Sequence, residues 1–195
     1  MAEKKNIGLF FGSFNPVHIG HTQLAEYLID KQLVDEVWFV ISPFNPLKNK
    51  TELIDEYQRL RMMQLAIVAK PKIKVTDVEF NLPIPSYTIN TLKVLRAEFP
   101  HFIFTLIMGS DNAMALHQWK NYKEILENHS IIVYPRDGYD ASNAIKQYPQ
   151  IKLLPTPFYN INSTEIRKYI SENKDVRKWL APQVFEYIKD NNLYL

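Results

Sequence analysis

The segment from Gly12 to His21 reads GSFNPVHIGH, and the patterns on either side of it decide the fold. Ile7 to Phe11, directly before it, is a compact apolar run typical of a buried strand. Apolar residues at helical spacing follow between positions 24 and 29, and Val37 to Ile41 is a second apolar run. Together they predict a β-α-β unit, in which a helix joins two parallel strands.

The same alternation continues along the chain. Further strands are expected at Ile73–Val78, Phe102–Met108, Ile131–Tyr134 and Ile151–Leu154, and further helices at Leu53–Ala69 and Ser86–Glu98. From Ser163 onward the pattern is helical only. The sequence therefore predicts an α/β fold with a doubly wound, mainly parallel sheet and a helical C-terminal segment. In such a sheet, ligands bind beyond the carboxyl ends of the strands.

The composition limits the number of domains and the classes of partner. The 195 residues are 46% hydrophobic, so residues 1–195 are expected to form a single domain around one site. Lys and Arg number 23 against 21 Asp and Glu, a balance that favours neither a nucleic acid nor a membrane as partner. A tRNA-binding module would need a basic surface interleaved with aromatic residues, and the charge gives no sign of one.

The absence of cysteine excludes disulfides, thiolate nucleophiles and cysteine metal sites. No apolar run resembles a signal peptide or approaches the length of a membrane span. We therefore expect a cytoplasmic protein. The sequence leaves open whether it forms a homo-oligomer.

His18 and His21 are the first candidate functional residues. They stand three residues apart at the start of the first helix, so both rings can face one point in front of its N-terminus. The helix dipole and free N–H groups favour a phosphate there, and Gly20 lets it approach the backbone. Two imidazole donors can neutralise an oxyanion. The alternative is that His18 caps the helix and His21 packs against the sheet.

A second helix start with similar chemistry lies near the C-terminus. Positions 161–167 read INSTEIR, in which Asn162 begins a capping box. The capping box explains the helix start but not the residues that follow it. The hydroxyl and N–H groups of Ser163 and Thr164, with Arg167 one turn later, are suited to binding phosphate.

Three other segments allow ordinary structural interpretations. Lys48 follows two prolines that stiffen its loop, and it is either an anion contact or a solvated lysine. Ser86 is expected to cap the helix that follows it. Asp111, two residues after Gly109 at the end of the central strand, can cap the next helix or accept hydrogen bonds from a ribose. Trp119 can be an ordinary core residue, because buried tryptophan is common, and the pattern alone leaves this open.

The segment from Gly12 to His21 resembles the signature of the nucleotidyltransferases that share a His-x-Gly-His motif. The resemblance implies a Rossmann-like fold and the use of the paired histidines on the phosphates of ATP. More narrowly, the chain resembles the bacterial nicotinate-nucleotide adenylyltransferases from near residue 7 to near residue 190. Three positions depart from their pattern. Asn15 replaces a frequent Asp, Asn162 replaces the first serine of Ile-Ser-Ser-Thr-x-Ile-Arg, and the altered turn at 134–138 leaves Arg136 without an assigned role.

The resemblance implies three groups of site residues and no metal ligand from the protein. The catalytic group is His18, His21 and Arg167. The group that binds ATP and its phosphates is Gly12, Ser13, Phe14, Gly20, Lys48, Gly109, Asp111, Ser163 and Thr164. The group that lines a nicotinate pocket is Tyr87, Thr88 and Trp119, with the tryptophan stacked on the pyridine ring.

The implied reaction is in-line attack by the 5′-phosphate of nicotinate mononucleotide on the α-phosphorus of ATP, giving deamido-NAD and pyrophosphate. Magnesium is expected to arrive with ATP, held by the nucleotide and water. The rival enzymes are phosphopantetheine adenylyltransferase, nicotinamide mononucleotide adenylyltransferase and cytidylyltransferases. A nucleotide-binding regulator without catalysis is the rival from another class. The presence of both histidines and of Arg167 argues against it.

Overall fold

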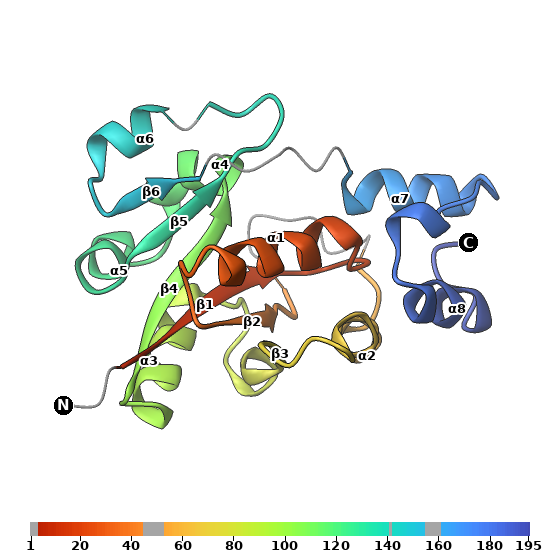
Figure 1. Ribbon diagram of the computed structural model, residues 1–195, viewed down its shortest axis with the longest axis horizontal. Coiled ribbons are helices and arrows are strands. Elements are labelled where there is room, and N and C mark those ends of the chain that lie inside the picture. The colour runs from red at the N-terminus through yellow and green to blue at the C-terminus, as the bar shows by residue number, and fades with distance from the viewer. Residues whose placement is uncertain (1–3, 45–52, 141, 155–160) are drawn as a thin grey trace.

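The computed structural model describes residues 4–44, 53–140, 142–154 and 161–195. Figure 1 shows strands that alternate with helices along nearly the whole chain. The elements in chain order are β1 (Lys5–Gly12), α1 (Ile19–Asp30), β2 (Glu36–Ile41), α2 (Glu56–Ile67), β3 (Ile73–Thr76), η2 (Val78–Asn81), α3 (Thr88–Glu98), β4 (Phe102–Gly109), α4 (Ser110–Met114), η3 (Leu116–Gln118), α5 (Tyr122–Asn128), β5 (Ile131–Tyr134), α6 (Ser142–Gln147), β6 (Ile151–Leu153), α7 (Ser163–Ser171), η4 (Arg177–Trp179) and α8 (Pro182–Asp190).

The strands form one sheet in the order β3-β2-β1-β4-β5-β6, and every neighbouring pair is parallel. The prediction of a doubly wound α/β fold is confirmed, with a sheet that is parallel throughout the described residues. The chain builds outward from β1 to β3 and then crosses to the other side of β1, where Phe10 is in register with Ile107 of β4. The carboxyl ends of β1 and β4 therefore flank the point at which the strand order reverses, which is where such folds bind ligands.

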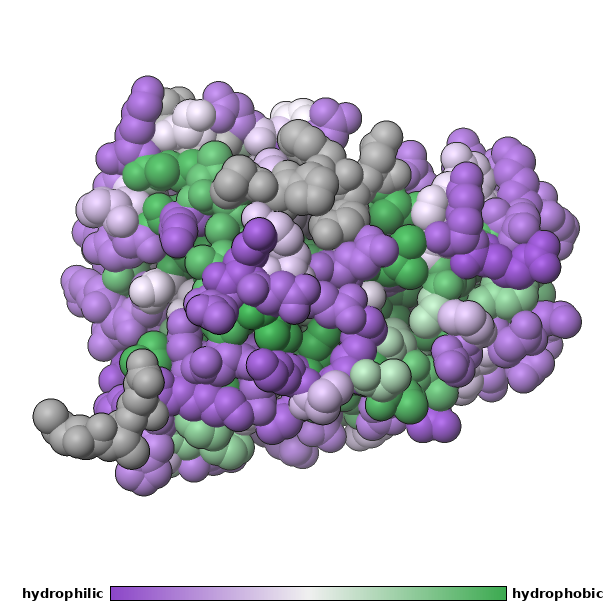
Figure 2. Space-filling view, viewed as in Figure 1, coloured by the Kyte–Doolittle hydropathy of each residue, from purple (hydrophilic) through white to green (hydrophobic). Residues whose placement is uncertain are grey.

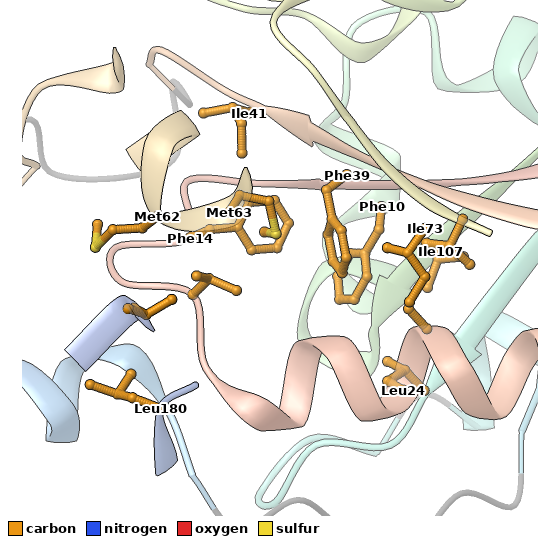
Figure 3. Close-up of a cluster of buried hydrophobic side chains, with 14 of the residues drawn as sticks. Phe10, Phe14, Leu24, Phe39, Ile41, Met62, Met63, Ile73, Ile107 and Leu180 are labelled. Carbon is orange, nitrogen blue, oxygen red and sulfur yellow. The ribbon is translucent and has the colours of Figure 1, made fainter. Parts of the chain in front are cut away.

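Successive side chains along the strands point to opposite faces of the sheet and pack into two separate hydrophobic cores. Ile7 and Leu9 of β1 pack with α3 and α5 on one face of the sheet. Phe10, the residue after Leu9, faces the other side of the sheet and packs with α1, α2, α7 and α8. Figure 3 shows this second core, with Phe10 beside Phe39 of β2 and Leu24 of α1 close to them. Covering both faces with helices is what a parallel sheet requires.

The C-terminal segment is helical, as predicted. Val184 and Ile188 of α8 are buried in the same core as residues of α2, so α8 packs directly against the rest of the domain. Figure 1 shows α7 and α8 together at the end of the molecule toward which β1 points. The helix start at Ser163 is thereby brought close to the loop after β1.

Two predicted boundaries differ from the structure for local reasons. The helix expected from Leu53 begins at Glu56, because the Asp55 carboxylate accepts hydrogen bonds from two backbone N–H groups of the first turn. The prediction that Ser86 caps the next helix is wrong, because α3 starts at Thr88, Tyr87 occupies the N-cap position, and no side chain among the described residues caps this helix.

The strand expected over 73–78 ends at Thr76 and gives way to the short helix η2. This turn carries Glu79 into the interior. The short helices α5 and α6 are not predicted by the sequence pattern.

No helix within the described residues is both long and apolar enough to cross a membrane. The face of the molecule in Figure 2 is mostly hydrophilic, with smaller apolar areas between polar side chains.

Candidate active site

Gly12 and Phe14 determine the shape of the loop after β1. A side chain on Gly12 would place its first carbon 2.9 Å from the ring of Phe14. Phe14 has a φ of 47°, in the left-handed region that non-glycine residues rarely occupy, and its ring is buried. That ring lies edge-on to the imidazole of His21, with 5.0 Å between centres. The side chain of Phe14 thus supports His21 from the core, and only its backbone is available to a ligand.

His18 and His21 lie together at the N-terminus of α1. Their rings are stacked with centres 3.7 Å apart. The backbone N–H of His18 donates a hydrogen bond of 3.2 Å to Nδ1 of His21. Because Nδ1 accepts, a neutral His21 carries its proton on Nε2, where it can be donated to a ligand.

His18 is the more buried of the pair, with 5% of its surface exposed. Burial and, as the smaller cause, the positive charge of Arg136 lower its pKa to about 3. The residue occupies the N-cap position, yet neither ring nitrogen has a hydrogen-bond partner among the described residues. Buried polar atoms are normally paired. The unpaired, uncharged imidazole of His18 is therefore suited to donate a hydrogen bond to a bound anion.

The N-terminus of α7 meets the same loop. Asn162 caps the helix by accepting from the backbone N–H of Glu165, as predicted. The Glu165 carboxylate accepts from the side-chain amide of Asn162 and not from its backbone N–H, so the reciprocal half of the predicted capping box differs. The hydroxyl of Ser163 donates to the carbonyl of Pro16 at 2.8 Å, and Nη1 of Arg167 donates to the carbonyl of Asn15 at 2.9 Å. Two helix N-termini far apart in the sequence thus converge on one side of the sheet.

Gly109 ends β4 in a place too crowded for any other residue. A side chain there would come within 2.4 Å of the carboxylate of Asp111 and 2.8 Å of the side chain of Arg136. Asp111 does not cap α4, because its carboxylate pairs with Nη1 of Arg136 at 2.9 Å. The backbone N–H of Arg136 also donates to the hydroxyl of Ser110.

Arg136 was left without a role in the sequence analysis, and the structure brings it into the site. It follows the end of β5, the strand next to β4, and its charge reaches His18. Its position two residues beyond an apolar strand was the available signal, since the carboxyl ends of parallel strands share one edge.

A cavity opens beside these residues between β1, β4 and the start of α3. Its volume is about 930 Å³, with the open space at its mouth included. The wall includes the predicted residues Gly12, Gly109, Tyr87, Thr88 and Trp119. Trp119 is half-buried, and its indole N–H has no partner among the described residues.

Arg59 is a structural residue of the site that sequence patterns did not reveal. Only 1% of its surface is exposed. Its Nη1 atom donates to the carbonyls of Ser13 and Ser42, each at 2.8 Å, and Nη2 donates to the carbonyl of Pro43. One guanidinium thus fastens the loop after β1 to the loop after β2. An arginine in an amphipathic helix is usually at the surface, so nothing in the sequence marked it.

Two expectations stay untested by the geometry. Lys48 lies outside the described residues. No group of three or more His, Asp or Glu side chains suited to a metal ion occurs in the described part of the chain, and the expectation that the protein supplies no metal ligand stays a prediction.

Comparison with known proteins places these features in a family. The chain matches the cytidylyltransferase-like family over residues 9–169. It is 47% identical over 189 residues to a probable nicotinate-nucleotide adenylyltransferase of Flavobacterium johnsoniae, covering 96% of this chain and 98% of the relative. A protein of the same name from Bacteroides thetaiotaomicron is 44% identical over 193 residues, covering 97% and 95%.

Among solved structures, the chain is similar to the nicotinic acid mononucleotide adenylyltransferase of Plasmodium falciparum complexed with NaAD. The TM-score is 0.84 at 24% identity, and the match covers 97% of each chain. A likeness at this identity supports the fold.

Proposed function

The chain belongs to the nicotinate-nucleotide adenylyltransferases of the cytidylyltransferase-like family, and from this premise we propose that it joins nicotinate mononucleotide to the adenylyl group of ATP. The products are deamido-NAD and pyrophosphate. Residues 1–195 act as one nucleotidyltransferase domain in this proposal.

The meeting of two helix N-termini carries the proposal. The start of α1 supplies two imidazoles, and the start of α7 supplies free N–H groups with Arg167 one turn later. Both lie at the point where the strand order reverses. Helix N-termini and an arginine fork are suited to phosphate oxygens, and a triphosphate offers several at once.

In the proposed reaction, an oxygen of the 5′-phosphate of nicotinate mononucleotide attacks the α-phosphorus of ATP. A new P–O bond forms, the bond from the α-phosphorus to the bridging oxygen breaks, and pyrophosphate leaves with the electron pair. No protein nucleophile takes part, so the rate must come from positioning and from neutralising negative charge.

His18 and His21 donate hydrogen bonds to the phosphate oxygens, on which charge builds up as the bond breaks. For His21 the donor is Nε2–H, because Nδ1 is already engaged with the backbone of His18. Arg167 and the N–H groups of Ser163 and Thr164 hold the outer phosphates, and Lys48 is proposed to contact phosphate as well. ATP enters as its magnesium complex, with the ion held by the nucleotide and water.

The remaining site residues are assigned to the two ends of the dinucleotide product. Asp111 accepts hydrogen bonds from the ribose of ATP while its other contact, to Arg136, keeps it in place. Ser13, Gly20, Gly12 and the backbone of Phe14 bring the loop close to the phosphates. In the cavity, Tyr87, Thr88 and Trp119 enclose the pyridine ring. A cytoplasmic location remains part of the proposal, and the oligomeric state stays open.

One assay tests the activity against its rivals. The purified protein is mixed with ATP, magnesium and, in separate reactions, nicotinate mononucleotide, nicotinamide mononucleotide or phosphopantetheine, and pyrophosphate release is followed. We expect the highest kcat/KM with nicotinate mononucleotide. Preference for phosphopantetheine would assign the chain to the rival enzyme, and binding of ATP without release of pyrophosphate from any mixture would support the regulator.

A further inference from the structure

Lys120 is a cation on the wall of the cavity that the proposed mechanism does not use. It follows Trp119 directly, and both line the cavity together with Tyr87. The ammonium nitrogen of Lys120 lies 4.4 Å from the centre of the Tyr87 ring, which is a cation–π distance. This contact holds a positive charge at the aromatic end of the cavity.

The charge of Lys120 has no carboxylate partner among the described residues. None of the ion pairs formed between described side chains includes it. Glu124, the acidic residue nearest to it in sequence, is engaged by Lys93 and by the side-chain amide of Asn121. The ammonium group is therefore available to an anion that enters the cavity.

Glu79 is the other cavity residue that carries an amine or carboxyl group in the described part of the wall. It is 1% exposed, and one of its oxygens accepts the hydroxyl of Thr91 at 2.7 Å. Burial raises the pKa of Glu79, which favours the uncharged acid. Lys120 is exposed whereas Glu79 is buried, so of these two groups the ammonium of Lys120 is the one that an entering ligand can reach.

We propose that the ammonium group of Lys120 pairs with the carboxylate on the pyridine ring and makes the enzyme prefer nicotinate over nicotinamide mononucleotide. The inference rests on the proposed function, because it places the pyridine ring beside Tyr87 and Trp119. A planar aromatic acid suits the surroundings, since its ring can lie against an aromatic side chain while its carboxylate reaches the cation. A neutral amide gains no ion pair there.

The test compares Lys120→Gln with the parent enzyme on both mononucleotides. We expect the KM for nicotinate mononucleotide to rise about two- to fivefold, since the lysine is solvent-exposed and an exposed ion pair is worth at most about 1 kcal/mol. The KM for ATP and the KM for nicotinamide mononucleotide should stay within about twofold of the parent. Added salt should weaken nicotinate mononucleotide in the parent more than in the variant.

Two further variants separate charge from packing. Lys120→Arg keeps the charge and the contact with an aromatic ring, so it should keep most of the preference. Lys123→Gln removes an exposed lysine from the neighbouring helix α5 and should behave as the parent. An unchanged KM for nicotinate mononucleotide in Lys120→Gln, an equal rise for the amide, or an arginine variant as poor as the glutamine one would each overturn the proposal.

Failure of the proposed function has a different signature. If the parent releases no pyrophosphate with either mononucleotide, the proposal of an adenylyltransferase activity is wrong. Calorimetric binding of nicotinate mononucleotide to the parent and to Lys120→Gln then still decides the role of the lysine. Equal affinities would remove it from the site.

Discussion

The Nη1 atom of Arg167 donates a 2.9 Å hydrogen bond to the backbone oxygen of Asn15, which joins helix α7 to the loop after β1. The guanidinium therefore has two tasks, since one edge fixes the loop and the rest of the fork is proposed to face phosphate. A lysine has no fork with which to do both.

We predict that Arg167→Lys lowers kcat/KM for ATP about tenfold to a hundredfold, the range of a lost hydrogen bond to a charged group. Steady-state kinetics at subsaturating ATP measure this. The matched control is Tyr194→Phe, which removes another hydrogen bond to Asn15 on the same loop without removing a proposed phosphate contact. If the two variants lose the same activity, Arg167 acts only through the loop.

His21→Ala tests the donor on α1. We expect kcat to fall about a hundredfold to a thousandfold, as when one donor to developing transition-state charge is removed. The ring also packs edge-on to Phe10 and Phe14, so the melting temperature must be measured on the same preparation. Near-normal turnover in a well-folded variant would remove His21 from the catalytic group.

The lowered pKa of His18, about 3, has a consequence for stability. The folded protein keeps His18 uncharged while the unfolded chain protonates it near pH 6.5, so between these values the unfolded state binds more protons. Stability from this residue is complete above about pH 6.5 and declines as the pH falls toward 3. His129, whose pKa burial also lowers, acts in the same direction.

Urea denaturation between about pH 4.5 and 7 measures this effect. We expect the parent to lose stability on acidification more steeply than His18→Asn, in which only His129 of the two remains. The imidazole resonances of His18 should show no titration near pH 6.5 in the free protein, and bound ATP should raise its pKa. Ordinary titration of His18 near 6.5 would contradict the burial argument.

The fold followed from the sequence because its signals are local. Apolar runs such as Ile7 to Phe11 end in loops with special residues, and their alternation with helical patterns determines the sheet. The convergence of His21 and Arg167 could be expected, since both follow a helix start at the carboxyl edge of the sheet. The strand boundary at Thr76 and the cap at Tyr87 could not, because they depend on where Glu79 is buried.

Arg59 shows why part of the site was beyond sequence reasoning. Its partners are backbone carbonyls, which carry no residue type, so no pattern of side chains points to them. Only the folded chain brings the loops after β1 and β2 to one guanidinium.

Arg59→Met should therefore destabilise the protein by at least about 1 to 3 kcal/mol, because buried carbonyls lose their donors. It should also raise the KM for ATP by loosening the loop that carries His18. Arg61→Met is the matched control, since Arg61 is exposed on the same helix. The urea midpoints of unfolding of the two variants are compared, and we expect the lower one for Arg59→Met. Equal midpoints would show that water or other donors replace the guanidinium.

The role proposed for Trp119 is to stack on the pyridine ring of the substrate in the cavity. If its indole stacks on the pyridine ring, Trp119→Ala removes a surface worth about 1 to 3 kcal/mol by analogy with base stacking, which is about fivefold to a hundredfold in affinity. The loss should fall on nicotinate mononucleotide and spare ATP.

The indole is half-buried and packs against the core on the α3 side of the sheet, so a purely structural role predicts another pattern. In that case the melting temperature falls and both Michaelis constants rise together, because the cavity wall itself collapses. Trp119→Phe, which keeps an aromatic face but shortens it, should restore most of the affinity for the mononucleotide only if stacking is the cause.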